Sequence, residues 1–461
     1  MNQSAKGKAR VLGIVRAYFR MVWVVLGILL FSTDGLYAVP PILFGAPTHY
    51  TNNTRVDRIS AGDFNEDGAL DLVTTDTSNS NLTVWINNGL GTFSVLTNIP
   101  AGGKPNVIKT GDLNRDNHID FVVKNQGTNA VSAFLGDGVG NFFFTNSILG
   151  TNSISLNTFG LTLGNFNSDD NLDAALVTDG DLRILLGGGD GGFVFKTNYA
   201  VGNYDVETAD FNGDHKLDLV TANYSSSSMS VCLGNGDGTF APPTHYSGDF
   251  SEYHYSVAVG DFNRDGKPDL TTVNLYSSSI SVRTNTGNGT FGPEVRYNGT
   301  ASLSTVAVGD FNADGNPDII AGKGNGSYGL TLLPGLGNGL FGTPLTNFTV
   351  IGSGLSDQAL ALGDFDGDNL VDIATVGGAA NLISVRLNQS VALLNIQSLP
   401  GKIVLSWPNW SAYQLQLRIH PTLPSWSSVG GNPTVIGNKR FLTNSLLGNS
   451  RVLYRLSATL P

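Results

Sequence analysis

A nine-residue acidic loop that occurs seven times constrains this chain more than any other feature of its sequence. Successive copies start about fifty residues apart. A regular period of this length is typical of propellers, solenoids and other repeat arrays, in which each repeat forms one supersecondary unit. The chain is therefore expected to consist of seven equivalent units. The copies occupy residues 63–71, 112–120, 165–173, 210–218, 261–269, 310–318 and 364–372.

Each loop carries Asp or Asn at its positions 1, 3, 5 and 9. Alternation directs these side chains toward one centre as the chain curls, and the main-chain carbonyl of position 7 can add a further oxygen. Oxygen ligands of this kind suit a hard cation, so the sequence predicts up to seven Ca²⁺ sites. The ligands predicted at positions 1, 3, 5, 7 and 9 of successive loops are Asp63, Asn65, Asp67, Ala69 and Asp71; Asp112, Asn114, Asp116, His118 and Asp120; Asn165, Asn167, Asp169, Asn171 and Asp173; Asp210, Asn212, Asp214, Lys216 and Asp218; Asp261, Asn263, Asp265, Lys267 and Asp269; Asp310, Asn312, Asp314, Asn316 and Asp318; and Asp364, Asp366, Asp368, Leu370 and Asp372.

The remaining loop positions predict the shape of the backbone. Position 6 is Gly in three loops and Asn, Asp or His in the others, and these residues best tolerate a positive φ. Position 2 is Phe or Leu and is expected to anchor the loop in the core. The third loop has Asn165 where the others have a first carboxylate, so we expect it to bind Ca²⁺ most weakly or to stay empty.

The loop is not an EF-hand, because that motif needs a bidentate Glu at position 12 and flanking helices. Position 12 here is Thr, Val, Leu or Ala, and a strand-like run such as LVTT or IIAG follows each loop. A dockerin loop is excluded on the same ground, since a helix should follow it.

Short apolar runs surround each loop and predict strands. One run leads into the loop, a second follows it, a third ends at a Gly-Asn turn closed by Phe, and a fourth completes the unit. Runs of this length with period-two alternation between Gly-rich turns are typical of strands. Four strands in each of seven units predict an all-β fold, a seven-bladed β-propeller.

The two ends of the repeat region are expected to meet. The seventh unit stops at residues 386–390, before its outer strand, whereas residues 42–52 resemble the outer strand of an earlier unit at 240–248. The N-terminal strand is therefore expected to close the last blade, which removes an exposed sheet edge.

These motifs resemble the FG-GAP/VCBS repeat family, which includes the propeller head of integrin α chains. The matching parts are the loop G-D-F-N-x-D-G-x-x-D and the turn G-[ND]-G-x-F, over about residues 42–390. The resemblance implies a propeller in which each loop holds Ca²⁺ between the first and second strands of a blade, through the loop positions already named.

The N-terminal residues predict secretion. Residues 1–20 are basic, residues 21–31 are apolar, and residues 36–38 fit a cleavage site, which together indicate a signal peptide over 1–38. An uncleaved anchor is the alternative, but it needs about twenty apolar residues, so no membrane span is expected in the mature chain. Seven Ca²⁺ ions would nearly neutralise that chain, so its acidity indicates metal sites and no nucleic-acid partner is expected.

The rest of the chain divides into a propeller over 39–390 and a C-terminal module over 391–461. The module contains three of the five Trp residues and five candidate strands, and it resembles the fibronectin-III-like β-sandwich modules of secreted bacterial proteins. Its Trp residues are expected to be core residues rather than sugar-stacking platforms. The single cysteine, Cys232, excludes an intramolecular disulfide and is expected to be a small buried hydrophobe. A large secreted chain without disulfides favours the envelope or surface of a bacterium.

No serine-hydrolase, zinc-protease, P-loop or dinucleotide motif occurs in the sequence, and no enzyme activity is expected. A binding face is favoured at the end of the blades opposite the acidic loops, where connecting segments are rich in Ser, Asn and Tyr. Aromatic rings beside hydroxyl groups suit glycan or protein contact, although tyrosine is also common in surface loops. The candidate ligand-binding residues are Tyr224, Tyr253, His254, Tyr255 and Tyr276.

The sequence therefore predicts a secreted, calcium-binding propeller that is a monomer and acts as a non-catalytic binding or cell-adhesion module for an extracellular glycan or protein. The alternative is a propeller-type polysaccharide lyase or hydrolase. That alternative requires a cluster of His, Lys, Arg or carboxylate side chains in the central channel.

Overall fold

The structure is a computed structural model. It describes residues 42–390, except 52–54, 127–129, 149–159, 179, 202–203, 249–252, 300–301, 324–328, 349–359 and 378–380, and seven strands beyond residue 394. The chain separates into two units, Met1–Val39 and Pro40–Pro461. The described residues all belong to the second unit, so the signal peptide predicted over 1–38 lies outside them. Among the described residues no helix is long and apolar enough to cross a membrane.

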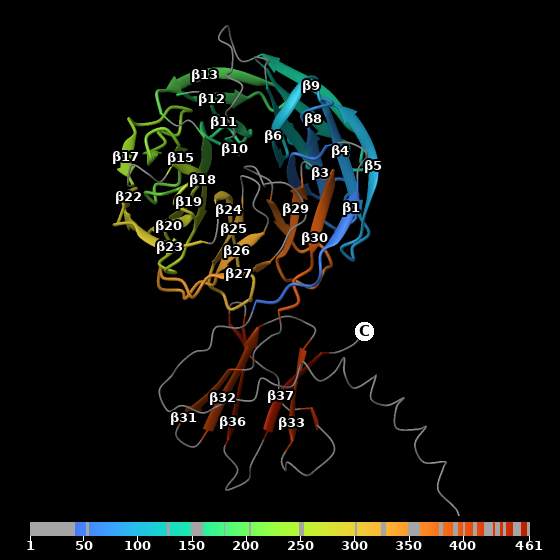
Figure 1. Ribbon diagram of the computed structural model, residues 1–461, viewed down its shortest axis with the longest axis vertical. Helices are drawn as coiled ribbons and strands as arrows, with labels where there is room; N and C mark the ends of the chain where they lie inside the picture. Colours follow the sequence, from blue (N-terminus) through green and yellow to red (C-terminus); the bar gives the residue numbers. More distant parts are fainter. Residues whose placement is uncertain are drawn as a thin grey trace, which may run out of the picture. The chain divides into compact units, whose positions relative to one another are not determined.

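Seven four-stranded antiparallel sheets form the blades of a propeller (Figure 1). The first strands of six blades line a central cavity of about 540 Å³, so the first strand lies at the centre and the fourth at the rim. The prediction of an all-β, seven-bladed propeller is confirmed.

The blades follow one another along the chain, and the seventh takes its outer strand from the N-terminal end. From centre to rim, the strands of the seven blades are β2 (Arg58–Gly62), β3 (Asp71–Asp76), β4 (Asn81–Asn87) and β5 (Phe93–Pro100); β6 (Lys104–Gly111), β7 (Asp120–Gln126), β8 (Ala130–Gly136) and β9 (Phe142–Ile148); β10 (Leu161–Gly164), β11 (Asp173–Val177), β12 (Leu182–Gly187) and β13 (Phe193–Tyr199); β14 (Asp205–Ala209), β15 (Asp218–Asn223), β16 (Ser228–Cys232) and β17 (Thr244–Ser247); β18 (His254–Gly260), β19 (Asp269–Asn274), β20 (Ser279–Arg283) and β23 (Val295–Asn298); β24 (Leu303–Gly309), β25 (Asp318–Lys323), β26 (Leu330–Leu333) and β27 (Leu345–Phe348); and β28 (Leu360–Gly363), β29 (Asp372–Gly377), β30 (Leu382–Arg386) and β1 (Thr48–Thr51). Blade five also contains a small hairpin, β21 (Asn285–Gly287) and β22 (Thr290–Phe291).

The core lies between neighbouring blades. The second strands β3, β15 and β19 are buried along their whole length, because both faces of a blade pack against adjacent blades and leave no face to water. One hydrophobic cluster, for example, joins Leu182 of blade three to Val206 of blade four. Cys232 is a fully buried member of that cluster, as expected from the sequence.

The N-terminal strand closes the ring as predicted. Strand β1 pairs antiparallel with β30, with Thr48 opposite Val385 and Thr51 opposite Leu382. Before this strand, Phe44 forms a bridge with Asn388, and the Gly45 amide donates to the Leu387 carbonyl at 2.9 Å. The last sheet is thus completed by residues from both ends of the repeat region.

The C-terminal part contains two separate sheets, with orders β31-β32-β36-β35 and β34-β33-β37. All five strands predicted there from the sequence occur, and β34 and β35 are additional. The assignment to a fibronectin-III-like sandwich, and the domain boundaries, stay predictions. The strands are β31 (Asn395–Leu399), β32 (Lys402–Pro408), β33 (Tyr413–Arg418), β34 (Ser427–Ser428), β35 (Thr434–Ile436), β36 (Lys439–Ser445) and β37 (Leu453–Ala458).

Candidate metal loops and binding face

The seven acidic loops join the first strand to the second in their blades, and their backbones share one conformation. Position 6 has a positive φ in every loop, from 65° at Asp170 to 87° at Gly68. The turn predicted from Gly, Asn, Asp and His at this position is therefore confirmed.

The backbone at position 4 also has a left-handed conformation, which the sequence did not indicate. The φ is 56° at Glu66, 65° at Arg115 and 50° at Ala313, and only the fourth and seventh loops have Gly there. A left-handed residue other than Gly costs about 1 kcal/mol or more. Positions 4 and 6 are thus both left-handed in every loop, so each nine-residue loop turns sharply at two places.

Loop oxygens accept hydrogen bonds from the loop's own backbone. In the fifth loop, the Asp261 carboxylate accepts from the amides of Asp265 at 3.0 Å and Gly266 at 2.9 Å. The side-chain oxygen of Asn263 also accepts from the Asp265 amide, and Asp265 accepts from the Lys267 amide, both at 3.0 Å. These bonds preorganise the side chains at positions 1, 3 and 5, and a carboxylate oxygen has a second lone pair for a cation.

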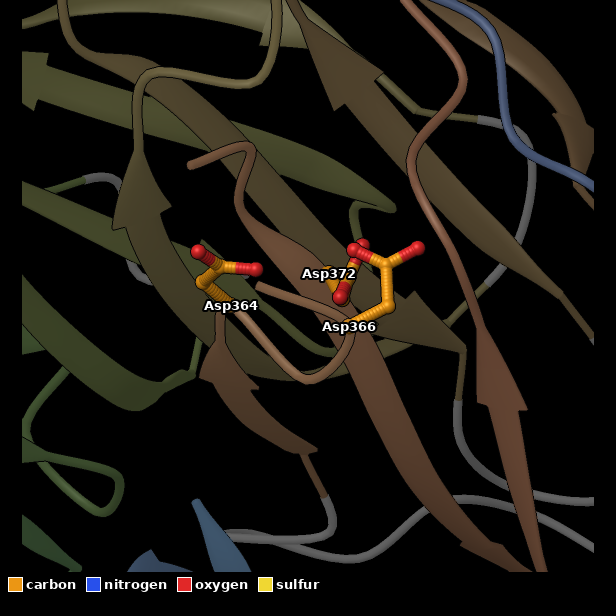
Figure 2. A group of neighbouring side chains, drawn as sticks. All are labelled: Asp364, Asp366 and Asp372. Carbon is orange, nitrogen blue, oxygen red and sulfur yellow. The ribbon is translucent and has the colours of Figure 1, made fainter. Parts of the chain in front are cut away.

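The seventh loop fits a cation best by chemistry. One oxygen each from Asp364, Asp366 and Asp372 lies within 4.8 Å of the others (Figure 2). Asp366 Oδ1 is buried without a hydrogen-bond partner, and burial together with the neighbouring carboxylates raises the pKa of Asp368 to about 6 and of Asp372 to about 7. A divalent ion would offset the repulsion among the three carboxylates and would give the buried Asp366 oxygen a partner. These residues therefore fit the predicted Ca²⁺.

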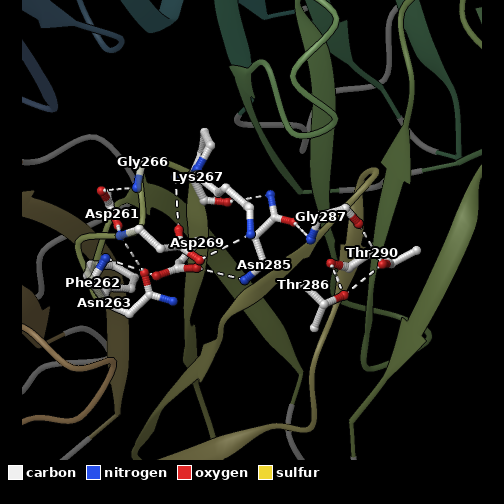
Figure 3. A network of polar contacts seen from close by, with 12 residues as sticks. Asp261, Phe262, Asn263, Gly266, Lys267, Asp269, Asn285, Thr286, Gly287 and Thr290 are labelled. Atoms are coloured by element: carbon white, nitrogen blue, oxygen red, sulfur yellow. Dashed lines mark hydrogen bonds and ion pairs between the residues drawn. The ribbon is translucent and has the colours of Figure 1, made fainter.

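The position-9 aspartate is fully buried in all seven loops. It connects the acidic loop, the start of the second strand and the segment at the end of the third strand. In blade five (Figure 3), Asp269 Oδ2 accepts from the Phe262 amide at 2.9 Å, and Oδ1 accepts from the Asn285 amide at 2.7 Å. The equivalent pair of bonds recurs in every blade. This residue therefore supports the fold whether or not it also binds a cation.

The loops are not identical. Asn165 in the third loop has a buried side-chain oxygen without a partner, and an amide cannot supply the negative charge of the aspartate found elsewhere at position 1. At position 7, the Lys267 ammonium pairs with Asp265 at 3.3 Å, and the His118 imidazole pairs with Glu66 of the preceding loop. The Ca²⁺ ligand sets, and weaker binding at the third loop, stay predictions.

Each loop also contributes a ring to the joint with the next blade. In six joints, the position-2 Phe meets a Phe of the following blade edge to face, with centroids 5.2 to 5.9 Å apart. The joint between blades two and three pairs Leu113 and Phe193 in one cluster instead. Position 2 is thus the core anchor that the sequence predicted. The ring pairs are Phe64–Phe142, Phe166–Phe240, Phe211–Phe291, Phe262–Phe341, Phe311–Phe44 and Phe365–Phe93.

Hydrogen bonds reinforce these joints. The Phe365 carbonyl of loop seven accepts from the Gly91 amide and from Asn87 Nδ2 in blade one, both at 2.8 Å. Gly91 has a φ of 71°, and a Cβ there would lie 2.7 Å from the Leu387 side chain. The Gly-rich turn is therefore required so that one blade can approach the acidic loop of its neighbour.

Tyrosines gather at the end of blades four and five that is opposite the acidic loops. We call Tyr204, Tyr224, Tyr253, Tyr255 and Tyr276 the tyrosine cluster. Tyr224 and Tyr276 lie in the turns that follow the second strands, and Tyr253 directly precedes the first strand of blade five. The ring centroids of Tyr253 lie 4.9 Å from those of both Tyr224 and Tyr276, and Tyr204 lies 4.0 Å from Tyr255. Four of the five predicted ligand-binding residues are thus brought together, and Tyr204 joins them.

His254, the fifth predicted residue, requires a correction. It is the first residue of strand β18, its side chain is fully buried, and its Nδ1 lies 2.9 Å from Thr272 Oγ1. Burial lowers the pKa of His254 to about 4, so the ring is neutral. Because its side chain is fully buried, the histidine cannot contact a ligand at the surface.

The central channel contains a charged cluster that the sequence analysis missed. Lys109 of β6 pairs with Glu207 of β14 at 3.0 Å, and Ser256 Oγ and the Val257 amide donate to Asp205 at 2.9 and 3.1 Å. Burial and the neighbouring Glu207 raise the pKa of Asp205 to about 6. Period-two alternation along β6 and β14 predicts that these side chains point into the channel. The other residues of the first strands are mostly apolar, so no pattern of charged residues indicated the cluster.

A ring of seven four-stranded sheets with an acidic loop between the first two strands of each blade defines a repeat-built β-propeller. The FG-GAP-like repeat profile matches residues 63–123, 165–221, 210–272, 265–321 and 310–375. These matches cover more than half of the chain, which therefore belongs to the FG-GAP-like repeat family.

No curated protein matches this sequence. Among solved structures, the fold is similar to two crystal structures of BBS1N in complex with ARL6DN, one soaked with lead and one with mercury, each with a TM-score of 0.53. The sequences are 10% and 11% identical, and the similarity covers 75% of this chain and 96% of the matched chain. At this identity the likeness concerns the fold alone.

Proposed function

We propose that this protein is a secreted, calcium-stabilised β-propeller that acts as a non-catalytic binding or adhesion module for an extracellular glycan or protein. The observation that carries the proposal is the tyrosine cluster, in which rings from separate segments of two blades contact one another at a surface. Tyr276 remains 59% exposed within this cluster. Clustered aromatic residues with one polar end are typical of binding surfaces.

The acidic loops support the calcium part of the proposal. In each blade they stand at the end opposite the tyrosine cluster, so ions there would stabilise the scaffold without contacting the ligand. Extracellular calcium modules often have dissociation constants of about 0.1–1 mM, which matches a location outside the cell. The basic and apolar leader over residues 1–38 supports secretion.

The test is a binding measurement on the chain from residue 39 onward, with Ca²⁺ and after its removal. Glycan and protein arrays should reveal a ligand whose binding falls when Tyr224 and Tyr276 are both replaced by Ala, while the melting temperature is unchanged. Binding that survives this double substitution would remove the tyrosine cluster from the function.

A second candidate function, a polysaccharide lyase or hydrolase, is favoured by one observation, the Lys109–Glu207–Asp205 cluster in the channel. An ammonium group beside carboxylates can supply general acid and base groups. This candidate predicts new reducing ends or unsaturated products from a polysaccharide, and their loss in Glu207→Gln. If no such products form, the binding module is favoured; products that form equally in wild type and Glu207→Gln exclude this cluster as the catalytic site.

A further inference from the structure

The tyrosine cluster holds one ring in a fixed, accessible position. Tyr276 is more than half exposed, yet its ring packs edge to face on Tyr253, with centroids 4.9 Å apart, and its hydroxyl lies 3.2 Å from the Tyr224 hydroxyl. The ring is held at its edge and at its hydroxyl, so a ligand that stacks on it restricts the side chain little further. Binding therefore costs little side-chain conformational entropy.

The cluster is itself anchored to both blades. The Tyr253 amide donates to Ser227 Oγ of blade four, and the Tyr253 carbonyl accepts from the Leu275 amide of blade five, each at 3.3 Å. Tyr253 has a φ of 51°, which is uncommon for a bulky residue, and strain of this kind is often stored at ligand-binding sites. Tyr255 packs against the core between blades five and six.

Among the described residues, the two turns that carry the exposed ring and its hydroxyl partner have neutral side chains and are rich in hydroxyl groups. The turns 224–227 and 275–278 contain only Tyr and Ser apart from Leu275, whose side chain is buried. Burial and the hydrogen bond to Tyr276 raise the pKa of Tyr224 to about 12, so its phenol keeps its proton at every physiological pH. Each phenol oxygen can donate one hydrogen bond and accept others, and two of them side by side suit adjacent hydroxyl groups of a sugar ring.

We propose that the tyrosine cluster is a subsite for a neutral oligosaccharide, in which a sugar ring stacks on Tyr276 and adjacent sugar hydroxyls bond to the Tyr224–Tyr276 hydroxyl pair. The proposal rests on the proposed binding function and narrows the class of ligand from a glycan or protein to a neutral oligosaccharide. An anionic ligand would call for Arg or Lys, which these two turns lack. A standard protein interface buries about 800 Å² on each partner, whereas one projecting ring with a hydroxyl pair matches a much smaller ligand.

The experiment uses the chain from residue 39 onward in Ca²⁺ and measures affinity for short cello-, manno- and xylo-oligosaccharides, with oligogalacturonates as the acidic comparison. A neutral oligosaccharide should bind, and Tyr276→Ala should weaken it about tenfold or more. Tyr276→Phe keeps the ring and should weaken it less. The matched control is Phe143→Ala in β9, because Phe143 is 61% exposed and lies in another blade; its affinity should equal that of the wild type.

Two results would overturn the subsite. One is binding of the acidic oligosaccharides alone, and the other is a neutral oligosaccharide whose affinity is the same in wild type and Tyr276→Ala. A parallel array of deglycosylated proteins separates this failure from failure of the proposed function. If Tyr276→Ala abolishes binding to a protein and no neutral oligosaccharide binds, the glycan assignment is wrong and the binding module stands. If Tyr276→Ala changes nothing on either array, both are wrong.

Discussion

The ring of Phe365, in the acidic loop of the last blade, meets the ring of Phe93 in the first blade edge to face, with 5.6 Å between centroids and 80° between ring planes. Phe365 stands between Asp364 and Asp366, two of the three clustered carboxylates. The predicted Ca²⁺ loop and the hydrophobic joint that closes the ring therefore share consecutive residues, so a shift of the loop backbone also displaces the Phe365 ring.

Removal of Ca²⁺ should lower the melting temperature strongly. At about 1 mM free Ca²⁺ and a dissociation constant of ~0.1 mM, each site adds roughly 1.4 kcal/mol, and seven independent sites would add about 10 kcal/mol. That is comparable with the whole stability of a typical domain. Calorimetry in Ca²⁺ and in EDTA measures the difference, and identical melting curves would contradict the calcium sites.

The ion-free protein should be more stable at pH 5.5 than at pH 8. Burial, the largest cause, raises the pKa of Asp269 to about 6, of Asp372 to about 7 and of Asp318 to about 8. The folded ion-free chain therefore keeps protons that the unfolded chain releases above about pH 4, so its stability falls as pH rises through this range. Ca²⁺ binds the deprotonated carboxylates, so its stabilising effect should grow with pH. Melting of stripped and Ca²⁺-loaded protein at both pH values checks this, and a stripped protein that melts higher at pH 8 would refute it.

Two aspartates of one loop should behave differently. Asp269→Ala leaves the buried amides of Phe262 and Asn285 without acceptors and should cost about 3 kcal/mol or more in EDTA, with up to about 1.4 kcal/mol more in 1 mM Ca²⁺ because a predicted ligand is also lost. Asp265→Ala removes only an exposed group and a predicted ligand. It should lower stability by up to about 1.4 kcal/mol in 1 mM Ca²⁺ and by about 0.5 kcal/mol or less in EDTA. Denaturant unfolding separates the two, and equal losses from both variants in EDTA would show that the distinction is wrong.

Phe365→Ala should destabilise the propeller by about 3–5 kcal/mol, because it opens a cavity at the closing joint. Phe143→Ala is the control, since that ring is already 61% exposed, and it should change stability by about 0.5 kcal/mol or less. Urea unfolding of both variants in Ca²⁺ gives the comparison. A Phe365→Ala protein as stable as the control would mean that the ring pairs do not hold the blades together.

Deletion of residues 42–51 should destabilise the propeller by at least about 3 kcal/mol, because the Phe44–Phe311 contact and the β1–β30 pairing are lost. The uncovered edge of β30 should also promote association, which size-exclusion chromatography detects. Truncation after residue 390 is the control, because the described strands beyond it pair only with one another. A deletion that leaves a stable monomer would contradict the closure.

The repeated features were readable from the sequence because they recur. Seven copies revealed the blade count, Gly68 and its equivalents predicted the turn, and the likeness of residues 42–52 to 240–248 predicted the closing strand. Features that lack a residue signature were missed. Position 4 is left-handed whether it is Glu66, Arg115 or Ala313, since the loop geometry overrides their preference.

Contacts between residues that are far apart in the sequence were not predicted either. The bond from the Asn285 amide to Asp269 and the ring contact between Phe365 and Phe93 depend on how strands and blades meet in space. The sequence predicts His254 in a connecting segment, whereas strand β18 begins at that residue and its side chain is fully buried. The contact of Tyr204 with Tyr255 likewise depends on how two segments meet in space.

Completion of the seventh blade by β1 sets the order in which the chain can fold. Each of the other six sheets is made of strands that follow one another in the sequence, so it can form as soon as its own segment has emerged. The seventh must wait for β30, because Thr48 has its partner at Val385. Strand β1 is therefore synthesised before the other strands of the propeller but can be placed only after β30, so a nascent chain stays an open arc of sheets until the seventh repeat has been translated.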